Sequence, residues 1–310
     1  MTKNSNLIVL GYHDVSGRGD ISSWLKVKAT AFERQIGLLK KIGTFIRPED
    51  LYLPDMLKKN RLNLLLTFDD GYSSNFKVAF PIIKHYQIPA LFFISTWNMQ
   101  TGQPFWFDKI IRPIQSNRIA SLDLRHLGLK KYHFSGWRAA FRWDDIHNLL
   151  EDLKKGEMKK RGIIDEAWAC LQRTCTTDES GRGENSDQPI SPDQILEMYR
   201  SGFCFFGSHS HQHMILNSLS DVEIAEDLKK SRMILESIIG SKVHQISYPN
   251  GDADDRIILA ARNAGYRLGF TTRRGRVNVQ SDEMNIPRLL VGGFDSSLRV
   301  LWKVGWQYMQ

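Results

Sequence analysis

Short apolar runs that alternate with amphipathic segments constrain the fold more than any other feature of this chain. Runs at residues 7–12, 62–68 and 90–95 predict buried strands, and segments 31–42 and 75–86 between them predict helices. Strands and helices that alternate in this way form parallel sheets with crossover helices. The first third of the chain therefore predicts an α/β fold.

The same alternation resumes after about residue 190. Ser191 can cap a helix whose first turn holds Pro192, and Gly240 and Gly265 follow two further helical segments. The predicted strands are 203–207, 244–248 and 268–272, and the two further helices are 221–239 and 254–264. Repeated units of this number predict a (β/α) barrel, in which catalytic residues lie at the C-terminal ends of the strands.

The stretch 100–190 interrupts this alternation. Helical runs at 143–155 and 164–173 are followed by a polar segment, 174–188, whose composition predicts a mobile loop. We interpret residues 1–310 as a single domain and 100–190 as a largely helical insertion on one rim of the barrel. The insertion is a substrate lid, an oligomer contact or an addition without function, and the sequence leaves these three alternatives open.

The composition is that of a soluble globular protein. The chain has 310 residues, of which 42% are hydrophobic and 25% charged. The first apolar run is too short for a signal peptide or a membrane span, and no later stretch reaches about 18 apolar residues. The three cysteines, an odd number, argue against a disulfide framework. We therefore expect a cytoplasmic protein without a membrane span.

The net charge of +8 favours anionic partners such as phosphates, acidic glycans or a membrane surface. An ordinary solvated surface explains the charge equally well, because several Lys and Arg residues alternate with Glu and Asp. We expect no nucleic-acid partner, since no motif for one is present, and a peripheral membrane contact is left open.

Two adjacent carboxylates, Asp69 and Asp70, follow the apolar run 62–68. Neighbouring carboxylates repel each other, so a cation readily holds one while the other stays available to accept a proton. The alternative is a simple turn, because Asp-Asp-Gly is common loop chemistry.

Two imidazoles, His209 and His213, lie four residues apart after a predicted strand. On a helical turn this spacing lets both rings bind one metal ion, and His211 between them is not needed. The alternative is a set of buried core histidines. With one carboxylate, the pair supplies three ligands, and the second carboxylate remains free, as in hydrolases that activate water on zinc.

The motif TFDDG at 67–71, followed by HSHQH at 209–213, resembles the NodB-type polysaccharide deacetylases, carbohydrate esterase family four. The opening GYHDV, the segment SYPNGDAD and the late Ile-Pro-Arg at 286–288 are similar to motifs of one branch of that family. A weaker similarity, FWFD at 105–108, is to members encoded in exopolysaccharide gene clusters.

This resemblance implies a deformed (β/α) barrel and a divalent metal, usually zinc. It implies that Asp69 is the general base and that the metal ligands are Asp70, His209 and His213. The implied reaction releases acetate from an N-acetylated sugar, with the oxyanion stabilised by the metal and by a backbone N–H near Tyr248 or Asn250. By the same resemblance, Tyr248, Pro249 and Asn250 bind the substrate.

The chain departs from the family pattern at two places. An RxPY motif usually supplies an arginine that pairs with the base, but here Ser247 stands in the arginine position, and we propose Arg288 as the substitute. The LxH motif that usually supplies the general acid is missing after residue 244. His13, at a predicted strand end, is our candidate for the acid, with a hydrogen-bonding role at the barrel rim as the alternative.

We therefore expect a metal-dependent N-deacetylase of glycan biosynthesis. Its substrate is an N-acetylated sugar, which in the cytoplasm is a nucleotide sugar or a lipid-linked saccharide. Two alternatives are a catalytically weak glycan-binding module and a deacylase of another amide or an ester. The sequence does not decide the sugar, the acyl group, the metal in the cell or the oligomeric state.

Overall fold

The computed structural model of the protein describes residues 6–17, 23–52, 61–116, 119–134, 139–174, 188–275, 277 and 282–309. The polar segment that we predict to be a mobile loop lies almost wholly outside the described residues, so it stays a prediction.

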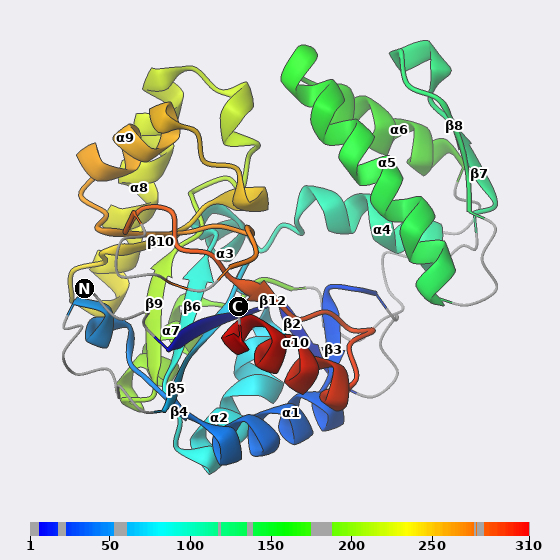
Figure 1. Ribbon diagram of the computed structural model, residues 1–310. Helices are drawn as coiled ribbons and strands as arrows, with labels where there is room; N and C mark the ends of the chain where they lie inside the picture. The colour runs from blue at the N-terminus through cyan, green and yellow to red at the C-terminus, as the bar shows by residue number, and fades with distance from the viewer. Residues whose placement is uncertain are drawn as a thin grey trace.

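A curled parallel sheet forms the centre of the molecule (Figure 1). The strand order is β11 (Leu268–Phe270), β10 (Gln245–Ser247), β9 (Cys204–Ser208), β6 (Ala90–Ile94), β5 (Leu62–Phe68), β1 (Leu7–Tyr12) and β12 (Leu289–Leu290). An eighth strand, β4 (Gly43–Phe45), pairs with the first half of β5, and β6 pairs with the second half. Every pairing in this sheet is parallel.

Residues 286–290 bring the two ends of the sheet together. Ile286 forms a parallel bridge with Phe270 of β11, and β12, just after it, pairs with β1. The sheet thus curls into a deformed (β/α) barrel, as predicted.

The central strands are buried on both faces. All residues of β1 and β5 are buried, and alternate side chains point to opposite sides of the sheet. Ile8 and Leu10 belong to the core under the outer helices, whereas Leu7 and Val9 belong to a smaller core with Phe93. This explains why the predicted strands are continuous apolar runs.

Helices cover the outside of the barrel (Figure 1). They are α1 (Ala29–Ile42), a π-helical turn η3 (Asn75–Ala79) continued by α2 (Phe80–Tyr86), α3 (Thr96–Thr101), α7 (Pro192–Arg200), α8 (Asp221–Ile239), α9 (Asp255–Asn263) and α10 (Ser297–Met309). Short elements between them are β2 (Asp14–Ser16), β3 (Lys26–Lys28), η1 (Pro48–Tyr52), η5 (Leu216–Ser218) and η6 (Pro249–Gly251). Ser191 caps α7 in a capping box, and Gly240 ends α8 with a φ of 68°, as predicted.

A second group of elements lies beside the barrel, at the upper right of Figure 1. It contains α4 (Trp106–Ser116), β7 (Ser121–Asp123), η4 (Arg125–Leu127), β8 (Lys131–His133), α5 (Ala139–Lys159) and α6 (Ile163–Thr174). These elements share a hydrophobic core of their own, which Tyr72 of the barrel joins. The helical character that we predict is present, and the limits of 100 and 190 stay a prediction.

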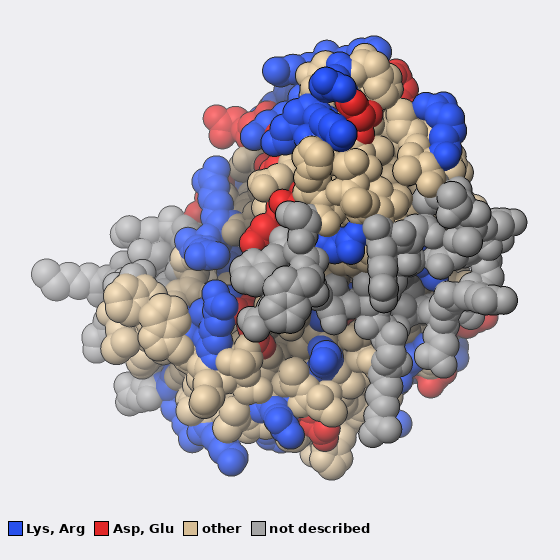
Figure 2. Space-filling model, turned by 90° about the vertical axis from the view of Figure 1, so that its right-hand side faces the viewer, with Lys and Arg blue, Asp and Glu red and all other residues tan. Residues whose placement is uncertain are grey.

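The surface carries charges of both signs. On the described part of the face in Figure 2, Lys and Arg side chains form several separate groups, with Asp and Glu side chains beside them. No helix among the described residues is both long enough and apolar enough to cross a membrane.

Candidate active site

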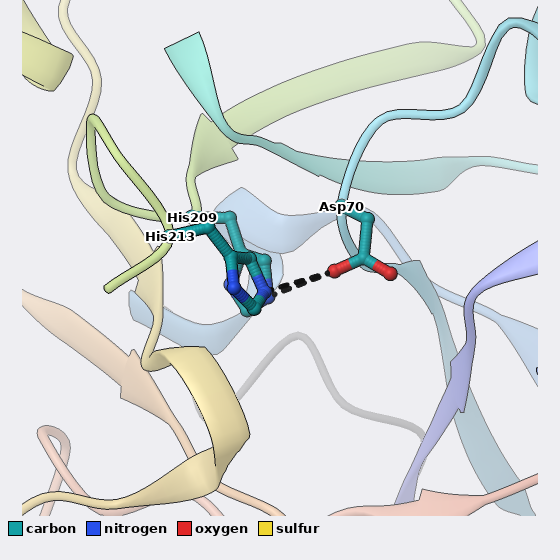
Figure 3. A group of neighbouring side chains, drawn as sticks. All are labelled: Asp70, His209 and His213. Atoms are coloured by element: carbon teal, nitrogen blue, oxygen red, sulfur yellow. Dashed lines mark ion pairs between the residues drawn. The ribbon is translucent and has the colours of Figure 1, made fainter. Parts of the chain in front are cut away.

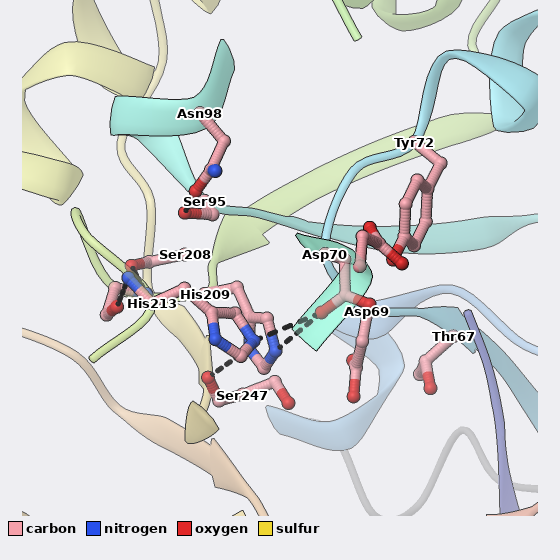
Figure 4. A network of polar contacts seen from close by, with 12 residues as sticks. Thr67, Asp69, Asp70, Tyr72, Ser95, Asn98, Ser208, His209, His213 and Ser247 are labelled. Atoms are coloured by element: carbon pink, nitrogen blue, oxygen red, sulfur yellow. Dashed lines mark hydrogen bonds and ion pairs between the residues drawn. The ribbon is translucent and has the colours of Figure 1, made fainter. Parts of the chain in front are cut away.

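The turn after β5 directs two carboxylates into one site (Figure 4). Asp70 has a φ of 71° and Gly71 a φ of 87°, and aspartate tolerates this left-handed region better than most residues. A side chain at Gly71 would be strained at this φ, and its Cβ would lie 2.9 Å from Ile94 Cδ1, so glycine is favoured there. The Asp-Asp-Gly segment is thus both a turn and a site.

The segment that carries the histidines is a loop, and our prediction of a helical turn is wrong. Ser210 and His213 have φ values of 63° and 51°, which no α-helix contains. Asp227 of α8 accepts hydrogen bonds from the N–H groups of His211 and Gln212, at 2.8 and 2.9 Å. These two bonds, which the sequence analysis missed, fix the loop to the outer helix.

The loop nevertheless brings both imidazoles to Asp70 (Figure 3). His209 Nε2 lies 3.3 Å and His213 Nε2 3.2 Å from Asp70 Oδ1. All three residues are buried, and the atoms that would bind a metal lie within 4.8 Å of one another. His211 instead places its Nδ1 2.8 Å from Thr96 Oγ1, which agrees with our expectation that it is not a ligand.

The surroundings of this triad fit a metal ion. His209 Nδ1 donates to the Ser247 carbonyl oxygen at 2.7 Å, so a neutral His209 would present the lone pair of its Nε2 to a metal ion, as in many metal sites. Asp70 Oδ2 is buried and has no hydrogen-bond partner among the described residues. Two imidazoles and one carboxylate, with an unpaired oxygen, are a donor set that divalent transition metals accept.

The charges within the site agree with this arrangement. Burial raises the pKa of Asp70, but hydrogen bonds from His209 and His213 outweigh it and hold that pKa far below its ordinary value. Burial lowers the pKa of His209, but the charges of Asp69 and Asp70 reverse the direction and raise it. The carboxylate of Asp70 is therefore ionised at any physiological pH.

Asp69 is held by Arg288 in a bidentate ion pair. Arg288 Nη1 donates to Asp69 Oδ1 and Nη2 donates to Oδ2, both at 2.7 Å. The other donors of the guanidinium reach Thr67 Oγ1, Ser247 Oγ and the Thr271 carbonyl oxygen, so all five are used. Our prediction that Arg288 lies beside Asp69 therefore agrees with the structure.

This ion pair keeps Asp69 ionised. Burial raises the pKa of Asp69, but the charges of Arg288 and His209 and the hydrogen bonds from Arg288 bring it below the ordinary value. Each carboxylate oxygen keeps a second lone pair that Arg288 does not use. Asp69 can thus accept a proton at neutral pH while its orientation stays fixed.

Ser247 explains the departure from the RxPY motif. Its hydroxyl accepts a hydrogen bond from Arg288 Nη2 at 2.9 Å, and its carbonyl oxygen accepts one from His209. A small residue at this position leaves space for a guanidinium that arrives from residue 288 instead. Ser247 therefore links the partner of Asp69 to a histidine of the triad, a role that the sequence analysis did not predict.

The two carboxylates and the two histidines lie in the wall of a cavity of about 1040 Å³. His13 lines the same cavity, and its Nδ1 is buried without a hydrogen-bond partner among the described residues. Burial lowers the pKa of His13, and the charges of Asp70 and Asp69 offset this only in part. The position of His13 suits a proton donor, and its role stays a prediction.

The predicted substrate-binding segment is only partly exposed to the cavity. Tyr248 and Asn250 line it, whereas Pro249 is buried and does not. The Tyr248 N–H donates to the Phe270 carbonyl oxygen, so this N–H is already paired, and our suggestion that a backbone N–H near Tyr248 or Asn250 binds the oxyanion stays a prediction. Asn250 Nδ2 is buried without a partner among the described residues, so it remains available as a donor to substrate.

Residues of the insertion reach the histidine loop. The rings of Phe105 and Phe107 lie 5.5 and 5.3 Å from the His213 imidazole, centroid to centroid, and Tyr72 also contacts Phe105. Tyr72 donates a hydrogen bond to Asp108 at 2.8 Å. These contacts place residues of the insertion in and beside the cavity wall, and the three alternatives for its role stay open.

Comparison with known proteins agrees with this geometry. A family model described as "Polysaccharide deacetylase" matches residues 57–133 and 144–269, well over half of the chain. The chain belongs to the polysaccharide deacetylase family. The match spans both motifs of the site, so the resemblance noted in the sequence is confirmed, and with it membership of a family of metal-dependent hydrolases.

Relatives within this family are distant but similar over almost the whole chain. A poly-β-1,6-N-acetyl-D-glucosamine N-deacetylase of Staphylococcus aureus is 22% identical over 93% of this chain and 80% of its own length. The Streptococcus pyogenes deacetylase PplD has a TM-score of 0.64 at 17% identity, covering 98% of this chain and 99% of its own. IcaB from Ammonifex degensii has a TM-score of 0.61 at 22% identity, covering 98% of both chains. These two structures confirm the barrel fold.

Proposed function

We propose that this protein is a zinc-dependent hydrolase that removes N-acetyl groups from an amino sugar of a glycan. The observation that carries the proposal is that two groups of residues lie in the wall of the same cavity. One is the triad of Asp70, His209 and His213, and the other is the ion pair of Asp69 with Arg288. Family membership and the name of the Staphylococcus aureus relative support this choice of substrate.

Zinc fits the triad better than magnesium or calcium. Two imidazoles and one carboxylate are typical of catalytic zinc sites, which keep a further position open for water or substrate. Magnesium and calcium prefer oxygen ligands throughout. When bound, the zinc would polarise the acetyl carbonyl and lower the pKa of a water molecule.

The side chains around the triad supply the remaining steps. Asp69, ionised and oriented by Arg288, accepts the proton of the attacking water. Because the pKa of Asp69 is low, it is a weak base and depends on a water that has been made acidic. Asn250 Nδ2 is free to donate to the substrate, and His13 is our candidate to protonate the departing amine.

The cellular setting is part of this proposal. We propose a cytoplasmic enzyme whose N-acetylated substrate is a nucleotide sugar or a lipid-linked saccharide.

The experiment that tests the reaction is mass spectrometry of acetylated nucleotide sugars and glycan oligomers after incubation with zinc-loaded protein. We expect the loss of acetyl groups from at least one of them, released as acetate. A chelator should abolish the release, and so should Asp69→Asn with its zinc still bound. If acetate release continues without metal or in the Asp69→Asn variant, the proposed chemistry is wrong.

Both alternative functions are tested by adding a binding measurement and acetylated ester and non-sugar amide substrates to this experiment. The altered RxPY motif suggested a glycan-binding module without strong catalysis, but Arg288 supplies the guanidinium that the motif lacks. Binding without acetate release would favour that module. Faster release from an ester or a non-sugar amide would identify a deacylase of another kind.

A further inference from the structure

The cavity continues beyond the two carboxylates and two histidines, between helices α5 and α10. Both helices contribute residues at helical spacing, so each turns one face towards the cavity. The face of α5 consists of Trp143, Asp144, His147, Leu150, Glu151 and Lys154, and the face of α10 of Arg299, Trp302, Lys303, Trp306 and Gln307.

Two tryptophans of α10 are exposed in this part of the cavity. Trp302 is 64% exposed and Trp306 is 52% exposed. Their rings stack on each other, with centroids 5.9 Å apart and planes 19° apart. The underside of α10 packs through Val300 and Val304, so the tryptophans are not needed to attach the helix. An exposed pair of large aromatic rings beside a cavity indicates a binding surface.

The charged side chains next to the tryptophans are paired. Asp295, which is buried, accepts Lys303 Nζ at 2.6 Å and lies 3.2 Å from Arg299 Nε. Across the cavity, Lys154 pairs with Glu151 at 2.8 Å. With Asp144, Asp252 and Arg274, which also line the cavity, the described charged side chains outside Asp69 and Asp70 are four acidic and four basic, so their net field is small. This region therefore suits a neutral ligand rich in hydroxyl groups better than an anionic one.

We propose that Trp302 and Trp306 form a stacking platform for sugar units that lie away from the reacting N-acetyl group. The apolar face of a pyranose ring packs on indole, while its hydroxyl groups reach the polar side chains around it. Of the substrates proposed above, the platform therefore favours a saccharide chain over a nucleotide sugar or a single sugar. This inference rests on the proposed function, because it places the rest of the same substrate.

The test measures binding separately from chemistry. Calorimetry follows the binding of β-linked N-acetylglucosamine, as a single sugar and as a pentamer, to zinc-loaded Asp69→Asn protein. Adding Trp302→Ala or Trp306→Ala should weaken the binding of the pentamer about tenfold and leave the single sugar unchanged. Trp302→Phe, which keeps an aromatic ring, should restore most of the loss.

Leu298→Ala and Met309→Ala are the matched controls. Both side chains are 76% exposed on the same helix, and neither lines the cavity. These two substitutions should change neither the affinity for the pentamer nor the affinity for the single sugar. The platform would be overturned if the tryptophan variants bound the pentamer as tightly as the Asp69→Asn protein that keeps both tryptophans. It would also be overturned if they lost affinity equally for the pentamer and the single sugar.

Two further outcomes separate this inference from its competitors. If the tryptophan variants lose binding to phosphatidylglycerol vesicles but keep the pentamer, α10 contacts lipid and the platform is wrong. If tryptophan-dependent pentamer binding occurs but the zinc-loaded wild-type protein releases no acetate, the platform stands and the proposed hydrolysis fails. If the tryptophan variants release acetate and bind both ligands as the wild-type protein does, the proposed hydrolysis stands and the platform is wrong.

Discussion

Arg288 is fully buried, and its ion pair with Asp69 is the most consequential contact at the level of single residues. Removing one member of a buried pair leaves the other charge without compensation, at a cost of about 3–5 kcal/mol. We therefore expect Arg288→Ala to lower both the stability and the activity of the enzyme.

Arg288→Lys separates these two effects. Lysine keeps the positive charge but cannot bind both carboxylate oxygens in parallel, so the protein should fold and bind zinc while kcat falls. Because Arg288 lowers the pKa of Asp69, weakening the pair should move the acid limb of the pH–rate profile to higher pH. Full activity of both variants would show that Arg288 is not the partner of the base.

The role of His13 is tested by the alkaline limb of the pH–rate profile. A general acid must carry its proton, so the rate falls as the pH rises through its pKa. Burial lowers the pKa of His13, so this fall should begin at a lower pH than for an ordinary histidine. His13→Ala should lower kcat by about 10²–10⁴ and lose the alkaline limb. A variant that keeps this limb would exclude His13 as the acid.

The sequence predicted the residues that meet at the site and one residue that supports them, Arg288, but not Ser247 or Asp227. The order and spacing of the two motifs identified Asp69, Asp70, His209 and His213, because chemistry dictates these residue types. Asp227 gave no comparable signal. It lies in an ordinary helical pattern, and its hydrogen bonds go to backbone N–H groups, which no side-chain pattern can reveal.

Among the elements, helix α8 controls the histidine loop through Asp227. Asp227→Ala leaves the N–H groups of His211 and Gln212 buried and unpaired, so the loop should lose its fixed shape. We expect zinc affinity to fall about 10–100-fold, as for other residues that orient metal ligands. Titration with a zinc indicator measures this directly.

Glu226→Ala is the control for this prediction. Glu226 is the exposed neighbour of Asp227 on the same helix, so its loss should leave zinc affinity unchanged. Equal affinities for Asp227→Ala and the wild-type protein would show that the loop holds its shape without α8.

Element prediction succeeded where one physical signal dominated. Strands β1 and β5 begin and end at the predicted residues because they are continuous apolar runs buried on both faces. Helix α8 also begins and ends as predicted, because Ser220 caps its start and Gly240 follows its last residue. Helix α10 was missed, although it supplies the exposed tryptophans. Its exposed apolar residues obscure the amphipathic pattern on which the analysis relied.

At the scale of the whole molecule, the barrel and the insertion have separate hydrophobic cores that share a boundary. Cys204 lies in the barrel core and Cys170 in the insertion core. Burial raises the pKa of Cys204 to about 12, so its thiol is almost wholly protonated and unreactive at pH 8. The two cysteines can therefore report the unfolding of each core.

We expect the two cores to unfold together, as a single domain. Tyr72 and the contacts of Phe105 and Phe107 with His213 join them. In a Cys175→Ser protein, alkylation of Cys170 and Cys204 at increasing urea concentrations should show one common midpoint. An earlier midpoint for Cys170 would show that the insertion unfolds independently.

The measurement that tests the metal site most directly is anomalous X-ray diffraction from crystals of the zinc-loaded protein. We expect one peak in the cavity, about 2.0–2.2 Å from His209 Nε2, His213 Nε2 and a carboxylate oxygen of Asp70. Asp69 should remain paired with Arg288 and unbound to the metal. A peak bound by Asp69, or the absence of a peak between the two imidazoles, would contradict the proposed enzyme.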